Sequence, residues 1–449
     1  MTGCVRRITA VVFAVVATTV TSLELRAQAP DATHQHGASA HVEGPPVTLQ
    51  SLLQEALQKN PELAALRDQI AVTKQRPAQQ RALAPPMAEA QIWQWPINTL
   101  NPANTNMYMF MVGQDLPGRG KRNARATVAE KDIELAAADV TIRARQIVNE
   151  ITQAYSALFI ARKATEIHLA SVDVLREIAD AAQARYTSGR GSQQDLLKPV
   201  VELSKLHNDV IMHDQEAGLA MARLNVLLNR PPESPIGPMD EPHEDILLPT
   251  SGELQQLAIA HQPELQRARI EIARAEAELA SAKLERKPDF NVQGGYQLMP
   301  NQTDGLLAKV GITWPNAPWS RGKIDAKVAE QSAAMTAATS RERAMENAVR
   351  LAVQEAYVRA TAAQARASLL RTTIVPQSRQ AFDVSRAAYQ ADRADFSAIL
   401  DTERGLLDAR LDYFRALADF TQAIADLERA VGTELPAGTT MRVSSAEGQ

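Results

Sequence analysis

The chain has 449 residues and a formal net charge of −4, and aromatic residues make up only 4 % of it. This mild charge argues against a nucleic-acid-binding protein, which needs a basic stripe. Alanine is abundant, and because it forms helices well and lets backbones approach closely, the composition favours long, tightly packed helices.

Residues 1–29 are typical of a secretory signal peptide: two arginines, an apolar run over residues 8–20 and a small-residue cleavage motif. Cys4, the one cysteine, precedes the apolar run instead of following the cleavage site, so we expect no lipid anchor. No later segment approaches the ~20 apolar residues of a transmembrane helix. We expect a flexible leader over residues 30–48 and a disordered tail over residues 436–449.

The remainder of the chain repeats itself about two hundred residues further on. Four short motifs recur: residues 60–63 at 262–265, 119–121 at 321–323 and 154–155 at 356–357 (202 residues each), and 185–186 at 388–389 (203 residues). The repeat is too long for a solenoid unit. We therefore expect two homologous units, residues 49–236 and 250–435.

Each unit is predicted to begin with a short helix, over residues 52–75 and 253–285. Two strands follow, over about 87–96 and 106–116 in the first unit and about 288–299 and 305–315 in the second. Apolar and polar residues alternate there over the length of a tilted membrane strand. The tryptophans fall in or beside these strands: Trp93, Trp95, Trp314 and Trp319. Such placement is typical of a membrane-interface belt, although a soluble sheet with buried tryptophans would look the same.

A long helical hairpin closes each unit. Residues 121–186 contain no proline or glycine, which predicts about 100 Å of helix at 1.5 Å per residue. Small and apolar residues recur every seven positions on coiled-coil seams: Ile151, Leu158, Thr165, Val172 and Ala179 with Ala154, Ala161, His168, Leu175 and Ala182, then Val353, Ala360, Ala367 and Ile374 with Ala356, Ala363 and Leu370. Pro376 should kink the second unit's helix.

The membrane interpretation of the strands requires an oligomer. Four strands per chain cannot close a lipid-facing barrel, and open sheet edges do not occur in hydrocarbon. Several chains must then contribute strands to one barrel.

These motifs, their order and their duplication resemble the TolC family of outer-membrane efflux proteins, over residues 47–432. The resemblance implies a mainly α fold with membrane β-structure: a homotrimer with a 12-stranded β-barrel in outer-membrane lipid, continued by a 12-helix periplasmic α-barrel. It also implies that the protein is a passive exit duct, whose partners are a periplasmic adaptor and an inner-membrane pump.

The resemblance places the tips of the helical hairpins at the periplasmic entrance. The family's tip pattern of a glycine, a small hydroxyl residue and an aspartate maps onto Gly189, Ser192 and Asp195. These residues are the expected adaptor contacts of the first tip. Asp195 is expected either to contribute a carboxylate to the pore entrance or to cap the helix that follows the turn.

In the second unit Asp392, Asp395 and Ala398 occupy the same places, so the glycine and the first aspartate of the pattern are missing. We expect Asp392 and Asp395 to contact the adaptor. Asp401 matches the family's second acidic residue and is predicted at the pore entrance, where a trimer would form a ring of carboxylates. The alternative is that Asp401 faces a neighbouring helix.

The cargo is left open between heavy-metal cations and drugs or other small molecules. His34, His36 and His41 could bind copper or zinc, or belong to a plain leader. The thioethers of Met107, Met109 and Met111 suit Cu(I), but these residues also alternate as one face of a strand.

No catalytic or cofactor motif is found, so the protein is not expected to be an enzyme. A function of a different class is a periplasmic coiled-coil adaptor without a pore. Such a protein typically carries one helical hairpin, whereas this chain carries two.

Overall fold

The computed structural model describes residues 46–435 except 96, 99, 100, 102, 103, 190, 191, 243–245, 301 and 392. The predicted signal peptide, the tail over residues 436–449 and most of the leader, with His34, His36 and His41, lie outside the described residues. So does Asp392.

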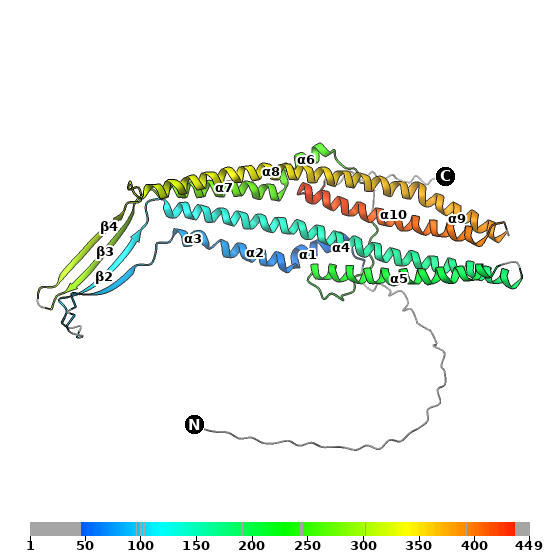
Figure 1. The fold of residues 1–449 in the computed structure, drawn as a ribbon, viewed down its shortest axis with the longest axis horizontal. Helices are drawn as coiled ribbons and strands as arrows, with labels where there is room; N and C mark the ends of the chain where they lie inside the picture. Colours follow the sequence, from blue (N-terminus) through cyan, green and yellow to red (C-terminus); the bar gives the residue numbers. More distant parts are fainter. Residues whose placement is uncertain are drawn as a thin grey trace, which may run out of the picture.

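The molecule is a long rod with a β-sheet at one end and the tips of two helical hairpins at the other (Figure 1). The strands are β1 (Met87–Trp93), β2 (Met107–Leu116), β3 (Asp289–Leu298) and β4 (Gly305–Thr313). The first-repeat helices are α1 (Leu49–Lys59), α2 (Pro61–Thr73), α3 (Arg76–Arg81), α4 (Lys121–Thr187) and α5 (Gln193–Leu227). The second-repeat helices are α6 (Ser251–His261), α7 (Pro263–Leu284), α8 (Arg321–Leu369), the π-helix η2 (Leu370–Ile374), α9 (Val375–Gln390) and α10 (Phe396–Val431).

The four strands form one antiparallel sheet in the order β1-β2-β3-β4, so β1 and β4 are its edges. Their register places most apolar side chains on one face of the sheet and most polar side chains on the other. Val292 pairs with Val310, and Phe110 pairs with Tyr296, on a face whose apolar side chains are exposed. Asn291 lies on the opposite face, which is largely polar. This alternation is the pattern that the sequence predicts for a membrane strand.

Each predicted short helix is two helices instead of one. Asn60 ends α1 and caps α2, its Oδ1 accepting from the backbone N–H groups of Glu62 and Leu63 at 2.9 and 3.3 Å. Pro61 opens α2, because its fixed φ suits the first helical position. Gln262 and Pro263 divide α6 from α7 at the equivalent place, although the Gln262 side chain makes no capping hydrogen bond. The prediction of a single helix overlooked that a proline ends the helix before it.

The repeated motif also fastens these breaks to the ends of the long helices. Asn60 Nδ2 donates to the carbonyl of Leu227 at 3.0 Å, and Gln262 Nε2 donates to the carbonyl of Ala430 at 3.1 Å. Both amides are buried. They satisfy carbonyls that the last turns of α5 and α10 leave without helical partners.

The helix α4 runs unbroken for 67 residues, about 100 Å, as predicted. Its predicted seam positions are buried, except that Thr165 and Ala179 are half-buried. In the second repeat the seam from Val353 to Ala367 is also buried, except that Ala363 is half-buried, but Ile374 is exposed.

The π-helix η2 explains this exception. A π-turn adds one residue to a helix, so the seam moves one position and continues through Phe382 and Tyr389, both buried. The repeat offset changes there as well: 357 − 155 = 202 before η2 and 389 − 186 = 203 after it. Pro376 lies just beyond, as the second residue of α9, so the regular helix is interrupted before the proline.

Separate apolar clusters hold the rod together along its length. One joins α1, α2, α4 and α5, a second joins α6, α8 and α10, and a third lies near the tips. Within the described ranges, no helix is both long enough and apolar enough to cross a membrane.

Candidate functional site at the hairpin tips

The first tip is a tight turn with a capped helix on its far side. Gly189 has φ +73°, a left-handed conformation that glycine adopts without strain, and its N–H donates to the carbonyl of Tyr186 at 3.0 Å. Ser192 then caps α5 in a reciprocal arrangement with Asp195. The Asp195 N–H donates to Ser192 Oγ at 3.3 Å, and the Ser192 N–H donates to Asp195 Oδ2 at 3.2 Å.

One of the two predicted roles of Asp195, that of N-cap residue, is therefore wrong. Ser192 is the N-cap, and Asp195 is the third helical residue, whose carboxylate returns the bond. Ser192 Oγ also contacts Asp195 Oδ2 at 2.8 Å. Because Oδ2 is committed to the cap, Oδ1 is the oxygen left to face a pore. The predicted pore role of Asp195 stays a prediction.

In the second tip an aspartate takes the role of the helix N-cap. Asp395 caps α10, its Oδ1 accepting from the Ala398 N–H at 3.0 Å. With the offset of 203, Asp395 stands where Ser192 stands in the first tip, and Ala398 stands where Asp195 does. The second tip thus lacks the carboxylate that returns the bond in the first tip, but its N-cap residue, Asp395, is itself a carboxylate.

Polar contacts tie the two hairpins together near their tips. Lys198 Nζ donates to Ser397 Oγ at 2.6 Å, and Glu202 forms an ion pair with Arg404. On the α4–α9 side, the Arg185 guanidinium lies 4.5 Å from the centre of the Tyr389 ring. These contacts fix the spacing of the two hairpins.

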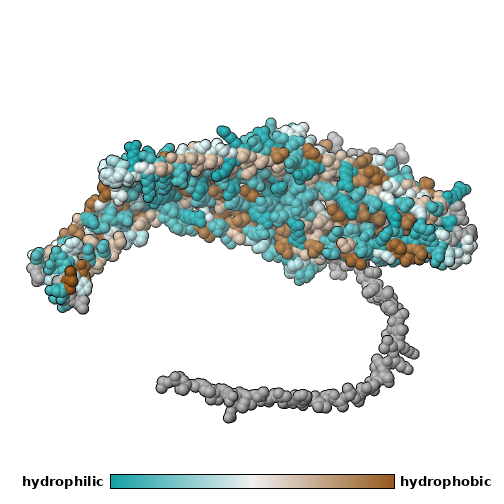
Figure 2. All heavy atoms as spheres, in the orientation of Figure 1, coloured by the Kyte–Doolittle hydropathy of each residue, from teal (hydrophilic) through white to brown (hydrophobic). Residues whose placement is uncertain are grey.

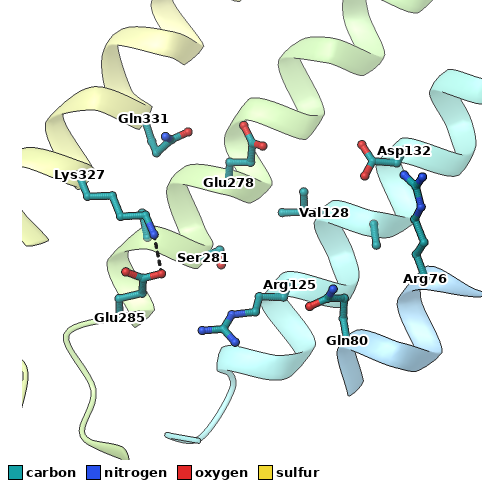
Figure 3. Close-up of a pocket in the computed structure, with 12 residues that line it drawn as sticks. Arg76, Gln80, Arg125, Val128, Asp132, Glu278, Ser281, Glu285, Lys327 and Gln331 are labelled. Atoms are coloured by element: carbon teal, nitrogen blue, oxygen red, sulfur yellow. Dashed lines mark hydrogen bonds and ion pairs between the residues drawn. The ribbon is translucent and has the colours of Figure 1, made fainter. Parts of the chain in front are cut away.

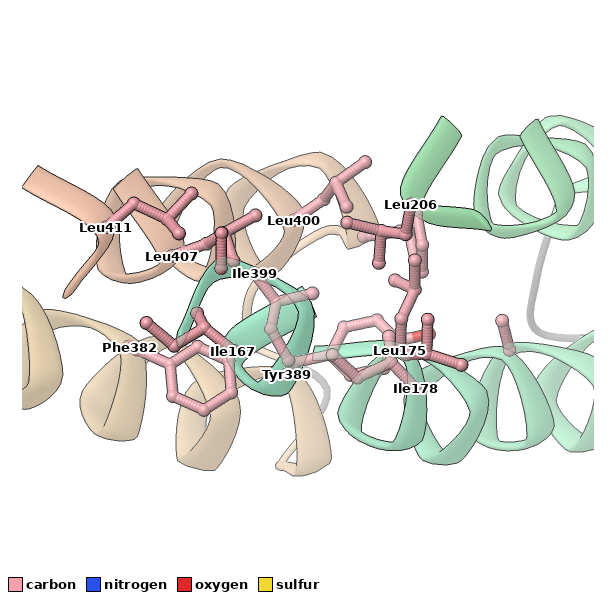
Figure 4. Close-up of a cluster of buried hydrophobic side chains, with 14 residues drawn as sticks. Ile167, Leu175, Ile178, Leu206, Phe382, Tyr389, Ile399, Leu400, Leu407 and Leu411 are labelled. Carbon is pink, nitrogen blue, oxygen red and sulfur yellow. The ribbon is translucent and has the colours of Figure 1, made fainter. Parts of the chain in front are cut away.

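An apolar cluster lies between these contacts. Figure 4 shows side chains of both hairpins in this cluster, among them Leu206 and Ile178 of the first and Phe382, Tyr389 and Ile399 of the second. All of these side chains are buried. This cluster therefore packs the two hairpins against each other.

Asp401 lies in a groove between α5 and α10. The groove has a volume of about 320 Å³ and includes Leu197, Lys198 and Arg404 among its lining residues. The Asp401 side chain is 73 % exposed, and its Oδ1 lies 3.8 Å from Arg404 Nη1. Lys198 occupies the position in the first repeat that Asp401 occupies in the second. An exposed carboxylate here can attract cations, but its pore role stays a prediction.

A buried carboxyl group two residues further along α10 was not recognised from the sequence. Glu403 is 5 % exposed, and burial raises its pKa above the usual range, while a hydrogen bond with Ser171 acts the other way. Its place four residues from both Ile399 and Leu407 was the available signal, because residues four apart share one face of a helix and these two neighbours are apolar.

A second groove lies near the sheet end of the rod, between α3, α4, α7 and α8. It has a volume of about 470 Å³, and Figure 3 shows charges of both signs around it. Lys327 Nζ lies 2.7 Å from Glu285 Oε1, and Arg274 Nε lies 2.6 Å from Asp132 Oδ1. These charged side chains are paired with each other in ion pairs. In the part of the chain that the structure describes, no three His, Cys, Asp or Glu side chains gather as a metal site.

The sequence matches the model of a known family in both repeats. The family is described as outer membrane efflux protein, and residues 52–230 and 254–433 match it. Among characterised proteins, the chain is 24 % identical over 343 residues to the cobalt-zinc-cadmium resistance protein CzcC of Cupriavidus metallidurans. That alignment covers 76 % of this chain and 79 % of CzcC.

The fold agrees with solved structures of similar size. The outer-membrane channel OprN superposes with a TM-score of 0.73 at 20 % identity, over 86 % of this chain and 89 % of OprN. CusC, whose structures concern transmembrane channel formation, superposes with a TM-score of 0.69 at 15 % identity, over 86 % of this chain and 92 % of CusC. With two family matches spanning both repeats, the chain belongs to the outer membrane efflux protein family.

Proposed function

We propose that this outer-membrane efflux channel works as a homotrimer, the passive exit duct of a tripartite efflux system. The observation that carries the proposal is the sheet itself. It has four strands, an exposed apolar face and two edges, β1 and β4. An edge in hydrocarbon leaves backbone N–H and C=O groups without partners, so each edge must pair with the edge of a neighbouring copy.

Exposed apolar side chains on the helices support the same assembly. A row of them follows α5: Leu197, Val200, Val201, Ile211, Met212, Leu219 and Val226. Apolar side chains are visible on this part of the surface (Figure 2). Contiguous exposed apolar surface marks an interface. A neighbouring copy of the chain would cover this row and continue the ring of helices.

The tips are where we place the adaptor. Ser192 and Asp395 hold the ends of the two hairpins in fixed turns, and the tips lie at the opposite end of the rod from the sheet. With the sheet in the outer membrane, the rod extends into the periplasm. Transport energy then comes from an inner-membrane pump that is connected through the adaptor.

For the cargo we propose heavy-metal cations. The argument is the similarity to CzcC, whose name records resistance to cobalt, zinc and cadmium. Deleting the gene should increase sensitivity to one or more of these metals. Unchanged growth on metals, with lost growth on drugs, would instead assign the protein to drug efflux.

Membrane fractionation tests the assembly against the rival function of an adaptor without a pore. We expect the protein in the outer-membrane fraction, and a trimer on unheated gels that becomes a monomer on heating. A monomer in the soluble or inner-membrane fraction would contradict the proposal and favour the adaptor.

A further inference from the structure

Three methionines of β2 form a row on the polar face of the sheet. Met107, Met109 and Met111 lie at alternate positions, so their side chains share one face. We call them the methionine row. Met109 lies between Gln91 of β1 and Gln297 of β3 in the register.

The surroundings of the row differ from those of core methionines. Glu89 and Gln91 lie opposite two of its members, and all three are partly exposed. Methionine usually fills irregular gaps in an apolar core. Most exposed apolar side chains of the sheet occupy the other face, and Met107 alone in the row has an apolar side chain opposite it, that of Trp93. The need for packing therefore does not explain three thioethers here.

Neighbouring residues make room for the row and orient it. Gly295 lies opposite Met111, and a Cβ at residue 295 would lie 2.9 Å from Met111 Cγ and 2.5 Å from the carbonyl oxygen of Phe110. The Met111 side chain therefore lies over a position that must be glycine. Gln297 Nε2 contacts Met109 Sδ at 3.7 Å, which fixes the central thioether.

The spacing of the row suits a particular kind of ion. Alternate residues of a strand lie about 6.6 Å apart, so two adjacent methionines can place their sulfur atoms on either side of one ion. Cu(I) and Ag(I) prefer soft sulfur ligands and accept two of them. Zinc is bound in proteins by thiolate, imidazole and carboxylate groups, and not by neutral thioethers. The outer two methionines, about 13 Å apart, are too distant to share an ion.

We propose that the methionine row binds Cu(I) or Ag(I) in two overlapping positions, one between Met107 and Met109 and one between Met109 and Met111. Neutral thioethers release an ion more readily than thiolates, and adjacent weak sites allow an ion to pass along a duct. The proposal rests on the proposed function: with the apolar face of the sheet toward lipid, its polar face would line the exit path. It adds a class of cargo, soft monovalent cations, to the metals named for CzcC.

Methyl-labelled methionine NMR of the purified, detergent-solubilised protein tests this directly, with Ag(I) in a chloride-free buffer as the probe. We expect the three methyl resonances of the row to shift on addition of Ag(I) and to stay in place with Zn(II). Equilibrium dialysis should show silver retained by the wild type. In the variant carrying Met107→Leu, Met109→Leu and Met111→Leu, that silver should be lost.

Single variants provide the sharper test, because Met109 belongs to both positions. Met109→Leu should abolish silver binding at the row, whereas Met107→Leu and Met111→Leu should each leave one position. The control variant carries Met221→Leu, Met335→Leu and Met345→Leu on the helices and should bind like the wild type. Equal losses in the three single variants, or no shift in the wild type, would overturn the proposal.

The assembly is measured on the same samples. A trimer that binds no silver overturns the methionine row alone and leaves the proposed duct intact. A monomer in the soluble fraction overturns the duct.

Discussion

Lys121, at the start of α4, and Asp289, at the start of β3, form an ion pair that joins the two repeats. Lys121 Nζ lies 2.7 Å from Asp289 Oδ1 and 2.8 Å from Oδ2, and the Gly118 N–H donates to Oδ1 at 2.7 Å. The Lys121 side chain is 5 % exposed. The repeat has no second copy of this pair, because Lys323 is exposed and residue 87, at 289 − 202, is a methionine.

We expect Lys121→Met to destabilise the protein by about 1–3 kcal/mol. This lies below the 3–5 kcal/mol for breaking a fully buried pair, because the Asp289 side chain is 41 % exposed. Lys323→Met, at the equivalent exposed position, should cost less than about 0.5 kcal/mol. Thermal unfolding followed by circular dichroism compares the two. Equal effects would mean that the pair contributes nothing specific.

The tip caps make a second prediction. Ser192→Ala and Asp395→Ala should each remove about 1 kcal/mol of local helix stability, since each removes the acceptor of an orphan N–H group. Amide hydrogen exchange in the first turn of α5 or α10 should then be about fivefold faster. Ser204→Ala, in the middle of α5, is the control and should leave both turns unchanged. Unaltered exchange in the cap variants would show that these turns are held by other contacts.

His168 predicts how stability depends on pH. It is buried and stacked on His213, with ring centres 5.1 Å apart, and burial, then His213, lowers its pKa below 6.5. Arg415 lowers the pKa further, while Asp209 and Asp408 raise it. The unfolded chain therefore binds a proton near pH 6.5 that the folded chain does not. Folding stability should fall as pH drops through about 6.5 and level off below the folded pKa.

Replacing His168 by leucine should reduce this loss. Thermal unfolding at about pH 7.5 and about pH 5.5 is the measurement, and the variant should show the smaller difference between the two. His261→Leu, at the exposed end of α6, should behave like the wild type. An unchanged acid loss in the His168 variant would assign the pH dependence to other groups.

The next prediction concerns Asp401 and the ion selectivity of the pore. If its exposed carboxylate lines the entrance, a trimer carries three of them, and Asp401→Asn should lower cation selectivity in planar-bilayer conductance without reducing trimer yield. The effect should be clearest at low salt, because a Debye length of about 8 Å screens the charge at physiological ionic strength. Asp173→Asn, on α4 with a side chain 77 % exposed, is the matched control. Selectivity unchanged at low salt would place Asp401 against a neighbouring helix.

Much of the fold was predictable because it depends on patterns that the chain repeats. Alternation indicated the strands, and the absence of proline and glycine from residues 121–186 indicated α4. The change of offset from 202 to 203 was visible too, between Tyr155 and Tyr186, yet its cause required the structure. A single extra residue in a helix leaves no recognisable pattern in the local sequence. Only the backbone shows that the π-helix η2 accommodates this residue.

The candidate site was less predictable, because its contacts join residues far apart in the chain. Ser192 and Asp195 follow the capping-box spacing, so their relation was available from sequence. From the sequence, nevertheless, Asp195 and not Ser192 was expected as the possible cap. Arg404 with Glu202, and Lys121 with Asp289, could not be paired without the structure. In both cases the equivalent positions of the other repeat lack the partner.

Disulfide cross-linking between copies tests the trimer most directly. Within one chain β2 pairs with β3. In the repeat, β4 of the second unit corresponds to β2 of the first, and β1 of the first unit corresponds to β3 of the second. The edge β4 should therefore pair with β1 of the next copy. Inside one chain these two edges lie three strand spacings apart, about 14 Å, too far for a disulfide.

The measurement starts from Cys4→Ser, which removes the native cysteine, and adds Ile92→Cys on β1. Cysteines at Ala308, Val310 or Ile312 scan the same face of β4, and Lys309→Cys, on the opposite face, is the control. We predict that at least one of the three pairs gives covalent dimers and trimers in oxidised outer membranes, and that the control gives none. Monomers from every pair would contradict a duct built from three chains.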